Sequence, residues 1–206
     1  EPGVTQSQLH DRLRDTGSQW WMDATGSGLG ASVLGNTVER GFGHSPLGDH
    51  FGATATVEVV LADGTVVQTG LGDLASERLA GAYPWGIGPV LDGLFSQSNL
   101  GIVTRATVWL NPRTKAYKAF VIQLEDDARF EELLDRLRPL RVAGTIQTPI
   151  HFANDLRIIS SKTRYPWDAT QGKVPLPDTL RRELALRYRT GAWSGMGGLY
   201  GTRAEV

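Results

Sequence analysis

A glycine-rich stretch carries the clearest chemical signal in the sequence. Residues 28–41 read GLGASVLGNTVERG, in which glycine, alanine and serine dominate the positions before Asn36. Because glycine has no Cβ, backbone N–H groups in such a stretch can face a bulky anionic or polar ligand directly. The stretch lacks the strand–GxGxxG–helix context of a dinucleotide site and the Lys-Ser/Thr pair of a P-loop. The residues alone leave two interpretations open, a cofactor-binding loop and a plain tight turn.

Histidines near this stretch are the other candidates for chemistry, because imidazole titrates close to neutral pH. His44 and His50 lie in the segment GFGHSPLGDHF that follows. Two histidines without a third ligand do not make a metal site. We interpret His50, beside Asp49, as half of a hydrogen-bonded structural pair. We expect the other two histidines, His10 and His151, at the surface or in packing contacts.

An adjacent pair of opposite charges, Glu39-Arg40, follows Asn36 in the same stretch. Such a pair on a loop is usually a solvated ion pair worth less than about 1 kcal/mol. The alternative is that one of the two side chains fixes the shape of the loop.

Three blocks of the sequence resemble the flavin domain of the vanillyl-alcohol oxidase and para-cresol methylhydroxylase family. They are GASVLGNTVERGFGHSPLGDHF (30–51), VEVVLADGTVVQTG (57–70) and GPVLDGLFSQSNLGIVTRATVWLNP (88–112), in the order of that family. The resemblance implies bound FAD. It implies that residues 1–112 are the second half of the family's FAD-binding domain and that residues 113–206 are the N-terminal part of its substrate or cap domain. The chain would then be an internal piece of a longer protein.

The resemblance also implies which residues contact the flavin. In the family, the glycine-rich loop lies along the ribityl chain and ring, and a later strand edge presents backbone groups to the adenine or ribityl part. Carried over to this sequence, the first segment supplies Ser27, Ala31, Ser32, Gly35, Asn36, Glu39, Gly41 and His44, and the second supplies Asn99, Gly101, Ile102 and Val103. No catalytic residue is assigned within the chain.

The function implied by the resemblance is a flavin-dependent oxidoreductase. It would transfer hydride from a para-substituted phenol or a related alcohol to flavin N5, with reoxidation by oxygen or a cytochrome, and a homo-oligomer is expected at full length. His44 and Leu47 stand where phenol-oxidising members carry tyrosines, and Ser27 stands where some members carry a carboxylate. These departures leave a hydroxy acid or another alcohol open as substrate. They also leave open a non-catalytic flavin-fold module or a partner-binding subunit.

A helix and a hairpin should position the first segment. Thr5 followed three residues later by Gln8 predicts a capping box, with a helix over Thr5–Gly17. Asp63-Gly64 between two apolar runs predicts a hairpin of Val57–Leu61 and Thr65–Thr69, in which both turn residues have positive φ.

Two further stretches complete the expected first domain. Glycine, alanine and proline dominate residues 71–90, which predicts a surface loop, followed by a helical turn at Leu91–Phe95. β-Branched residues over Gly101–Leu110 predict a strand that stops at Asn111-Pro112.

Signals for strands and helices alternate in the second half of the chain. Strands are expected at Tyr117–Leu124, Thr145–Ile150 and Trp193–Tyr200. Helices are expected at Asp127–Arg138, with Asp127 as N-cap and Pro139 beyond its end, and at Asp178–Arg189, capped by Asp178 and ended by Gly191. Together these elements predict an α+β fold, an antiparallel sheet with flanking helices.

Composition and charge exclude several classes of protein. With 40% hydrophobic and 21% charged residues, the 206-residue chain is typical of a folded soluble protein. Its 21 basic and 22 acidic residues provide no basic face for nucleic acid. No apolar run approaches the roughly 20 residues that a membrane span needs, so we expect a soluble protein, cytoplasmic or periplasmic. The absence of cysteine rules out disulfides and thiolate metal sites.

Overall fold

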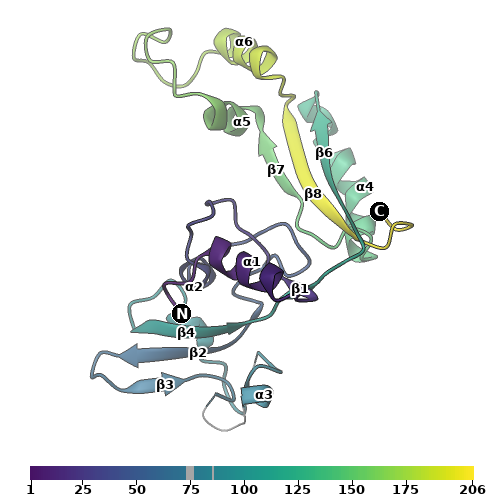
Figure 1. Ribbon diagram of the computed structural model, residues 1–206. Coiled ribbons are helices and arrows are strands. Elements are labelled where there is room, and N and C mark those ends of the chain that lie inside the picture. The colour runs from purple at the N-terminus through teal and green to yellow at the C-terminus, as the bar shows by residue number, and fades with distance from the viewer. Residues whose placement is uncertain (73–76, 85) are drawn as a thin grey trace. The chain divides into compact units, whose positions relative to one another are not determined.

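The computed structural model describes residues 1–72, 77–84 and 86–206. They form two compact units, Glu1–Lys115 and Ala116–Val206. Both units combine helices with antiparallel sheet, so the predicted α+β fold is confirmed (Figure 1). The division falls close to the predicted boundary after Pro112, while the assignment of the units to a flavin domain and a cap domain stays a prediction.

Helix α1 (Gln6–Asp15) opens the first unit with the capping box that the sequence predicts. The Thr5 hydroxyl accepts a hydrogen bond from the backbone N–H of Gln8, and the Gln8 side chain accepts one from the backbone N–H of Thr5. Two donors that would otherwise lack partners at the helix start are thereby satisfied. Gly17, with a φ of +63°, takes the left-handed conformation just beyond the C-cap.

The core of the first unit is an antiparallel sheet in the order β3-β2-β4 (Figure 1). β2 (Thr54–Leu61) lies between β3 (Val66–Gln68) and β4 (Gly101–Val108). Val57 and Val59 on β2 are at most 1% exposed, so this strand is the centre of the hydrophobic core. Among the described residues β4 pairs with β2 alone, which makes it an edge strand.

The hairpin between β2 and β3 turns on one glycine. Gly64 has a φ of +86°, and its N–H donates to the Leu61 carbonyl at 3.0 Å. Asp63 does not have a positive φ, so the prediction that both turn residues are left-handed is wrong. Instead the Asp63 carboxylate accepts a hydrogen bond from the Thr65 N–H at 2.9 Å, which lowers the pKa of that carboxyl. A turn followed by a single left-handed glycine is a common hairpin connection.

A two-residue pairing joins the two ends of the first unit. β1 (Trp20–Trp21) lies antiparallel to β5 (Asn111–Pro112), and the Trp21 indole N–H donates to the Pro112 carbonyl at 3.1 Å. The sequence predicted only that a strand stops at Asn111-Pro112 and missed this pairing. Pro112 is compatible with a strand edge, where no ladder N–H is needed.

Short helical elements complete the first unit. They are α2 (Val33–Val38), α3 (Glu77–Ala80) and the 3-10 helix η1 (Asp92–Phe95). η1 confirms the predicted helical turn. Of the surface loop predicted over 71–90, residues 73–76 and 85 lie outside the described residues, and α3 lies in the remainder.

The second unit contains another antiparallel sheet, in the order β6-β8-β7. β6 (Ala116–Leu124) and β8 (Trp193–Gly201) confirm two predicted strands. The strand predicted over Thr145–Ile150 is wrong, and β7 forms at His151–Asn154 instead. Before β7, Thr148 contacts β8 through its side chain and not through backbone strand pairing. The buried Thr148 hydroxyl donates to the Gly198 carbonyl and accepts from the Gly198 N–H, each at 3.0 Å.

Three helices accompany this sheet (Figure 1), namely α4 (Phe130–Val142), α5 (Asp155–Lys162) and α6 (Asp178–Tyr188). The sequence did not predict α5. Its N-cap is Asn154, whose side chain accepts a hydrogen bond from the Arg157 N–H at 2.9 Å.

The predicted limits of α4 and α6 are partly wrong. Before α4, in the 3-10 helix η2 (Asp127–Arg129), the capping carboxylate is Asp126 and not Asp127. α4 then continues through Pro139 to Val142, and because Pro139 is exposed, water can satisfy the carbonyl that loses its N–H partner. For α6, Pro177 and not Asp178 is the N-cap, and Arg189 and not Gly191 ends the helix, with a φ of +52°.

Aromatic side chains attach the start of α4 to the sheet. The Phe130 ring stacks on Trp193 of β8 with 4.2 Å between centroids, and it meets Phe152 of β7 edge-on at 5.4 Å. A glycine on β8 makes room for this cluster, because a Cβ at Gly195 would lie 2.5 Å from the Phe152 ring. The glycine spacing of β8 therefore has a packing reason.

An ion pair joins α5 to α6. The Arg181 guanidinium donates to both carboxylate oxygens of Asp155, with distances of 2.5 Å and 2.7 Å. The Asp155 side chain is only 9% exposed. Burial acts to raise the pKa of Asp155, but the hydrogen bonds from Arg181 and from the Leu156 N–H outweigh it, so the pKa is lowered overall.

Replacing Gly64 by valine should destabilise the protein. A β-branched side chain resists the left-handed conformation, at a cost of about 1 kcal/mol or more, and Gly64 has a φ of +86°. Urea unfolding of Gly64→Val against Ala62→Val, a neighbouring turn position without positive φ, measures the difference. Equal losses in the two variants would contradict this account of the turn.

The Asp155–Arg181 pair should appear in the pH dependence of stability. The pKa of Asp155 in the native state is lowered below its value of about 3.9 in the unfolded chain. Its contribution is therefore present above that pH and is lost as the pH falls through the native pKa. Asp155→Asn should be less stable than the wild type at neutral pH and lose less stability on acidification, as measured by urea unfolding at several pH values. The exposed Asp168→Asn serves as control, and parallel wild-type and Asp155→Asn curves would contradict the assignment.

Candidate functional site

The turn at residues 26–30 offers an exposed backbone surface. Ser27 and the glycines of this turn are exposed, and Gly28 has a φ of +105°. A Cβ built on Gly26, Gly28 or Gly30 would meet no atom within 4 Å. The turn is also anchored, because the Gln6 side chain donates to the Gly28 carbonyl at 2.7 Å. An anchored backbone that faces open space suits a ligand that must approach closely.

The loop predicted over residues 28–41 is wrong in its second half, because Val33–Val38 form α2. Ser32 is the N-cap, and its hydroxyl accepts from the Gly35 N–H at 3.0 Å and donates to the Pro2 carbonyl at 2.7 Å. Gly35 is therefore helical, with no positive φ. The serine three residues before Gly35 was the available cap signal. Ala31 and Ser32 adjoin the exposed turn, whereas Gly35 does not belong to a loop.

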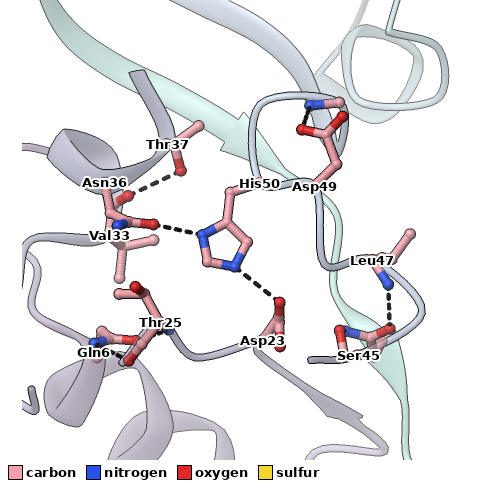
Figure 2. Close-up of polar contacts among 12 residues, drawn as sticks. Gln6, Asp23, Thr25, Val33, Asn36, Thr37, Ser45, Leu47, Asp49 and His50 are labelled. Atoms are coloured by element: carbon pink, nitrogen blue, oxygen red, sulfur yellow. Dashed lines mark hydrogen bonds and ion pairs between the residues drawn. The ribbon is translucent and has the colours of Figure 1, made fainter. Parts of the chain in front are cut away.

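Asn36 and His50 meet inside the first unit (Figure 2). His50 Nδ1 lies 2.5 Å from Asn36 Oδ1, and His50 Nε2 lies 2.9 Å from Asp23 Oδ2. The side chains of His50 and Asp23 are 12% and 7% exposed. The predicted pairing of His50 with Asp49 is wrong, because the Asp49 carboxylate accepts a hydrogen bond from the Gly52 N–H at 2.9 Å.

This imidazole forms a fixed linkage between three segments. Oxygen atoms flank both ring nitrogens, so the direction of each hydrogen bond depends on the tautomer of the ring and on the orientation of the Asn36 amide. An N–H at Nε2 would donate to the Asp23 carboxylate, because an ionised carboxylate only accepts. The backbone closes tightly around the linkage, because a Cβ at Gly41 would overlap the Asn36 side chain and one at Gly43 would overlap the Asp23 carboxylate. Gly41, predicted as a cofactor contact, thus packs against Asn36.

A small pocket lies beside this linkage and has a volume of about 40 Å³. Its lining includes polar and apolar side chains, among them Gln6, Met22, Asp23, Thr25, Asn36, Thr37, Leu47 and His50. Such a volume holds one or a few water molecules and not a substrate or cofactor.

The second candidate segment is the start of β4. Asn99 is exposed and Ile102 is 71% exposed. Gly101 allows the strand to pack on β2, since a Cβ there would lie 2.5 Å from Val59 Cγ1. Because β4 is an edge strand, alternate residues over 101–103 direct their N–H and C=O groups away from β2. The start of β4 thus has outward-facing backbone groups, while the contacts of Ile102 and Val103 with a cofactor stay a prediction.

Hydrogen bonds bring the second segment to the C-terminal end of α2. The Gln97 N–H donates to the Val38 carbonyl at 3.0 Å, and the Gln97 side chain donates to the Glu39 carbonyl at 3.3 Å. Segments more than fifty residues apart in the chain therefore adjoin each other. The Glu39 side chain itself is exposed.

His44 lies in a different setting from His50. Its half-buried ring meets Phe42 edge-on, with 6.2 Å between centroids. The next part of this loop is held by a buried side chain that the sequence did not reveal. Asn111, 2% exposed, accepts from the Leu47 N–H at 3.2 Å and donates to the Ser45 hydroxyl at 2.9 Å.

Two kinds of feature are absent from the described part of the chain. No group of three or more His, Cys, Asp or Glu side chains there could hold a metal ion. The helices of residues 1–72, 77–84 and 86–206 also include none with the length and apolarity needed to cross a membrane.

Known proteins share both the sequence and the fold. The chain is 41% identical over 97% of its length to 1'-carboxy-chondrochloren decarboxylase of Chondromyces crocatus, of which it covers 37%. It is 36% identical over 100% of its length to the flavoprotein subunit of hydroxylating 4-cresol dehydrogenase of Pseudomonas putida, of which it covers 40%. A crystal structure of p-cresol methylhydroxylase with substrate bound superposes with a TM-score of 0.90 at 35% identity, covering 100% of this chain and 40% of that one. No protein-family model matches the sequence. The chain thus spans less than half the length of these relatives.

Removal of the His50 ring should destabilise the first unit. His50→Ala would leave the nearly buried Asp23 carboxylate without this donor, at a cost of about 2–4 kcal/mol. His10→Ala is the matched control, because His10 is exposed on α1. Urea unfolding measures both variants, and a His50→Ala midpoint equal to that of the control would show that the linkage contributes nothing.

Two glycines of the site should differ sharply in their tolerance of alanine. Gly43→Ala would drive a Cβ into the Asp23 carboxylate and should cost about 1–3 kcal/mol. Gly26→Ala adds a Cβ where no atom lies within 4 Å and should change the free energy of unfolding by less than about 0.5 kcal/mol. The reverse order of the two would overturn the packing described here.

Proposed function

We propose that the chain, which belongs by sequence and fold to the p-cresol methylhydroxylase family of flavoproteins, forms part of an FAD-dependent oxidoreductase that oxidises a para-substituted phenol or a related alcohol. The observation that carries the proposal is the likeness over the full chain to a 4-cresol dehydrogenase flavoprotein, in sequence and in fold. The activity belongs to the whole protein, because the chain corresponds to less than half of these relatives.

The residues of the first unit fit an extended polar cofactor. The glycine turn at 26–30 faces open space, so a ribityl chain or ring could approach its backbone without meeting a Cβ. The edge of β4 supplies N–H and C=O groups along a line. When bound, FAD supplies the acceptor for hydride, and the protein supplies binding, orientation and electrostatics.

Nine of the twelve predicted residues have a role in this proposal that follows from their position, and Gly35, Glu39 and His44 have none. The contacts from the turn would come from Ser27, whose exposed hydroxyl can donate one hydrogen bond, and from the backbone beside Ala31 and Ser32. The contacts from the strand would come from Asn99 and the backbone of residues 101–103. Asn36 and Gly41 would not contact the cofactor. They would support the loop from inside the unit, because the Asn36 side chain bonds to His50 and packs against Gly41.

The substrate class follows from the names of the relatives and from two substitutions. A para-substituted phenol is favoured by the likeness to 4-cresol dehydrogenase. A substrate that carries a carboxylate, such as a hydroxy acid, is the second candidate. It is supported by the name of the carboxy-chondrochloren decarboxylase and by His44 and Leu47 at positions where the family resemblance expects tyrosines.

The electron acceptor would be oxygen or a cytochrome. The relative from Pseudomonas putida is named as a subunit, which supports a partner protein for electron transfer and an oligomer of the whole protein. The alternative to an enzyme is a non-catalytic flavin-fold module, for which the specific observation is Ser27 in place of the carboxylate of some relatives.

The intact protein should show flavin absorbance bands and should be bleached anaerobically by its substrate. A para-alkylphenol should reduce the flavin faster than a 2-hydroxy acid if the phenol assignment is correct. Reduction by the hydroxy acid alone would favour the second substrate class. A yellow protein that neither compound reduces would favour the non-catalytic module. A colourless protein that takes up no added FAD would contradict the proposed function.

The 206-residue chain by itself should bind FAD weakly, with a dissociation constant above about 1 µM. The exposed turn and strand edge form one wall, so the cofactor would stay largely hydrated and lose much of the burial that drives binding in a deep pocket. Titration of the isolated chain while flavin fluorescence is followed gives the constant. Saturable binding well below that concentration would show that the two segments suffice for the cofactor.

A further inference from the structure

Arg40 and Ser96 form the centre of a junction between the two candidate cofactor segments. The Arg40 Nε–H donates to the Ser96 hydroxyl at 2.9 Å, and this hydroxyl donates to the Val38 carbonyl at 3.0 Å. Ser96 is 6% exposed. With the two bonds from Gln97 to Val38 and Glu39, the residues around the C-terminal end of α2 are thus fixed to the residues just before β4.

The backbone at this junction is unusual on both sides. Arg40 has a φ of +54° and Gln97 a φ of +50°. Residues other than glycine rarely adopt this left-handed conformation, and such conformations persist only where surrounding contacts hold them. Here the two residues come from distant segments, and both take part in the hydrogen bonds that join the end of α2 to the residues before β4. The hydrogen bonds of the junction therefore hold both residues in a conformation that only glycine adopts easily.

The Arg40 guanidinium is held from two directions. Besides its bond to Ser96, its Cζ lies 5.8 Å from the centre of the Phe51 ring, within the range of a cation–π contact. Phe51 follows His50, so the same loop that bears the buried linkage also contacts the arginine. A planar guanidinium with a fixed fork can satisfy both contacts at once, whereas a lysine ammonium lacks that geometry.

We propose that Arg40 is a positioning residue for the flavin site. Through Ser96 it sets the spacing between the turn at 26–32, which α2 connects to the junction, and the strand edge at 99–103. This role rests on the proposed function, because it assumes that both segments face FAD. Arg40 and Ser96 need not touch the cofactor. They act by fixing the distance between the two backbone segments that would contact it.

The test uses the intact protein and measures FAD affinity separately from stability. Arg40→Ala should raise the dissociation constant for FAD about tenfold, the factor expected for loss of one hydrogen bond to a charged group. It should also alter the visible circular dichroism of the bound flavin, which reports the setting of its ring. Ser96→Ala should do the same, and the effects of the two substitutions should be less than additive in the double variant, because both remove the hydrogen bond between Arg40 and Ser96. The dissociation constant of Arg40→Lys for FAD should lie between those of Arg40→Ala and the wild type.

Arg105→Ala is the matched control, because Arg105 is an exposed arginine on β4 with a single long contact of 3.8 Å to Glu58. It should leave FAD affinity and the flavin spectrum unchanged. If Arg40→Ala and Ser96→Ala lower only the thermal stability of the apoprotein and leave affinity and spectrum as in the wild type, the positioning role is wrong. If Arg40→Ala does not fold, Arg40→Lys and Ser96→Ala decide by the same two readouts. A wild-type protein that takes up no FAD would overturn the proposed function itself and this assignment with it.

Discussion

The His50 imidazole is the contact on which the arrangement of the first unit depends. It joins the loop that precedes β2 to Asn36 of α2 and to Asp23 after β1. Backbone hydrogen bonds tie the loop to the end of α2 through Gly41, and the imidazole adds Asp23 to this arrangement through a side chain. Because the Asp23 side chain is only 7% exposed, its hydrogen bond to the ring lies in a largely desolvated setting, where such a bond is stronger than in water. The glycines that close over the linkage leave no room for a different geometry.

One consequence is a division of tasks between side chains and backbone. Polar side chains such as Asn36 and His50 point inward and help to determine the shape of the unit, while the turn at 26–30 and the edge of β4 present backbone groups outward beside the exposed side chains of Leu29 and Ile102. A surface made of backbone groups does not depend on which side chains occupy neighbouring positions. Positions such as His44 and Leu47 can therefore differ from the family pattern without loss of the proposed cofactor surface.

The sequence predicted those elements that local interactions decide. Thr5 with Gln8 identified the start of α1, Gly64 identified the hairpin, and the fold class followed from the order of strand and helix signals. Errors arose where neighbouring residues could serve the same purpose, as with Asp126 and Asp127 before α4. The Ser32 cap of α2 was hidden by the glycine content around it. The linkage of His50 to Asp23 could not be predicted, because a separation of 27 residues has no periodicity and only the folded chain brings the two together.

The pairing of β1 with β5 has a consequence for the time at which the first unit can form. The indole of Trp21 and the carbonyl of Pro112 are separated by 91 residues, so closing this contact requires nearly the whole unit to be available. Contacts of such long range slow folding, because the entropy of loop closure is lost before the contact stabilises the chain. During synthesis, the Trp21 indole N–H therefore finds this acceptor only after Pro112 has left the ribosome.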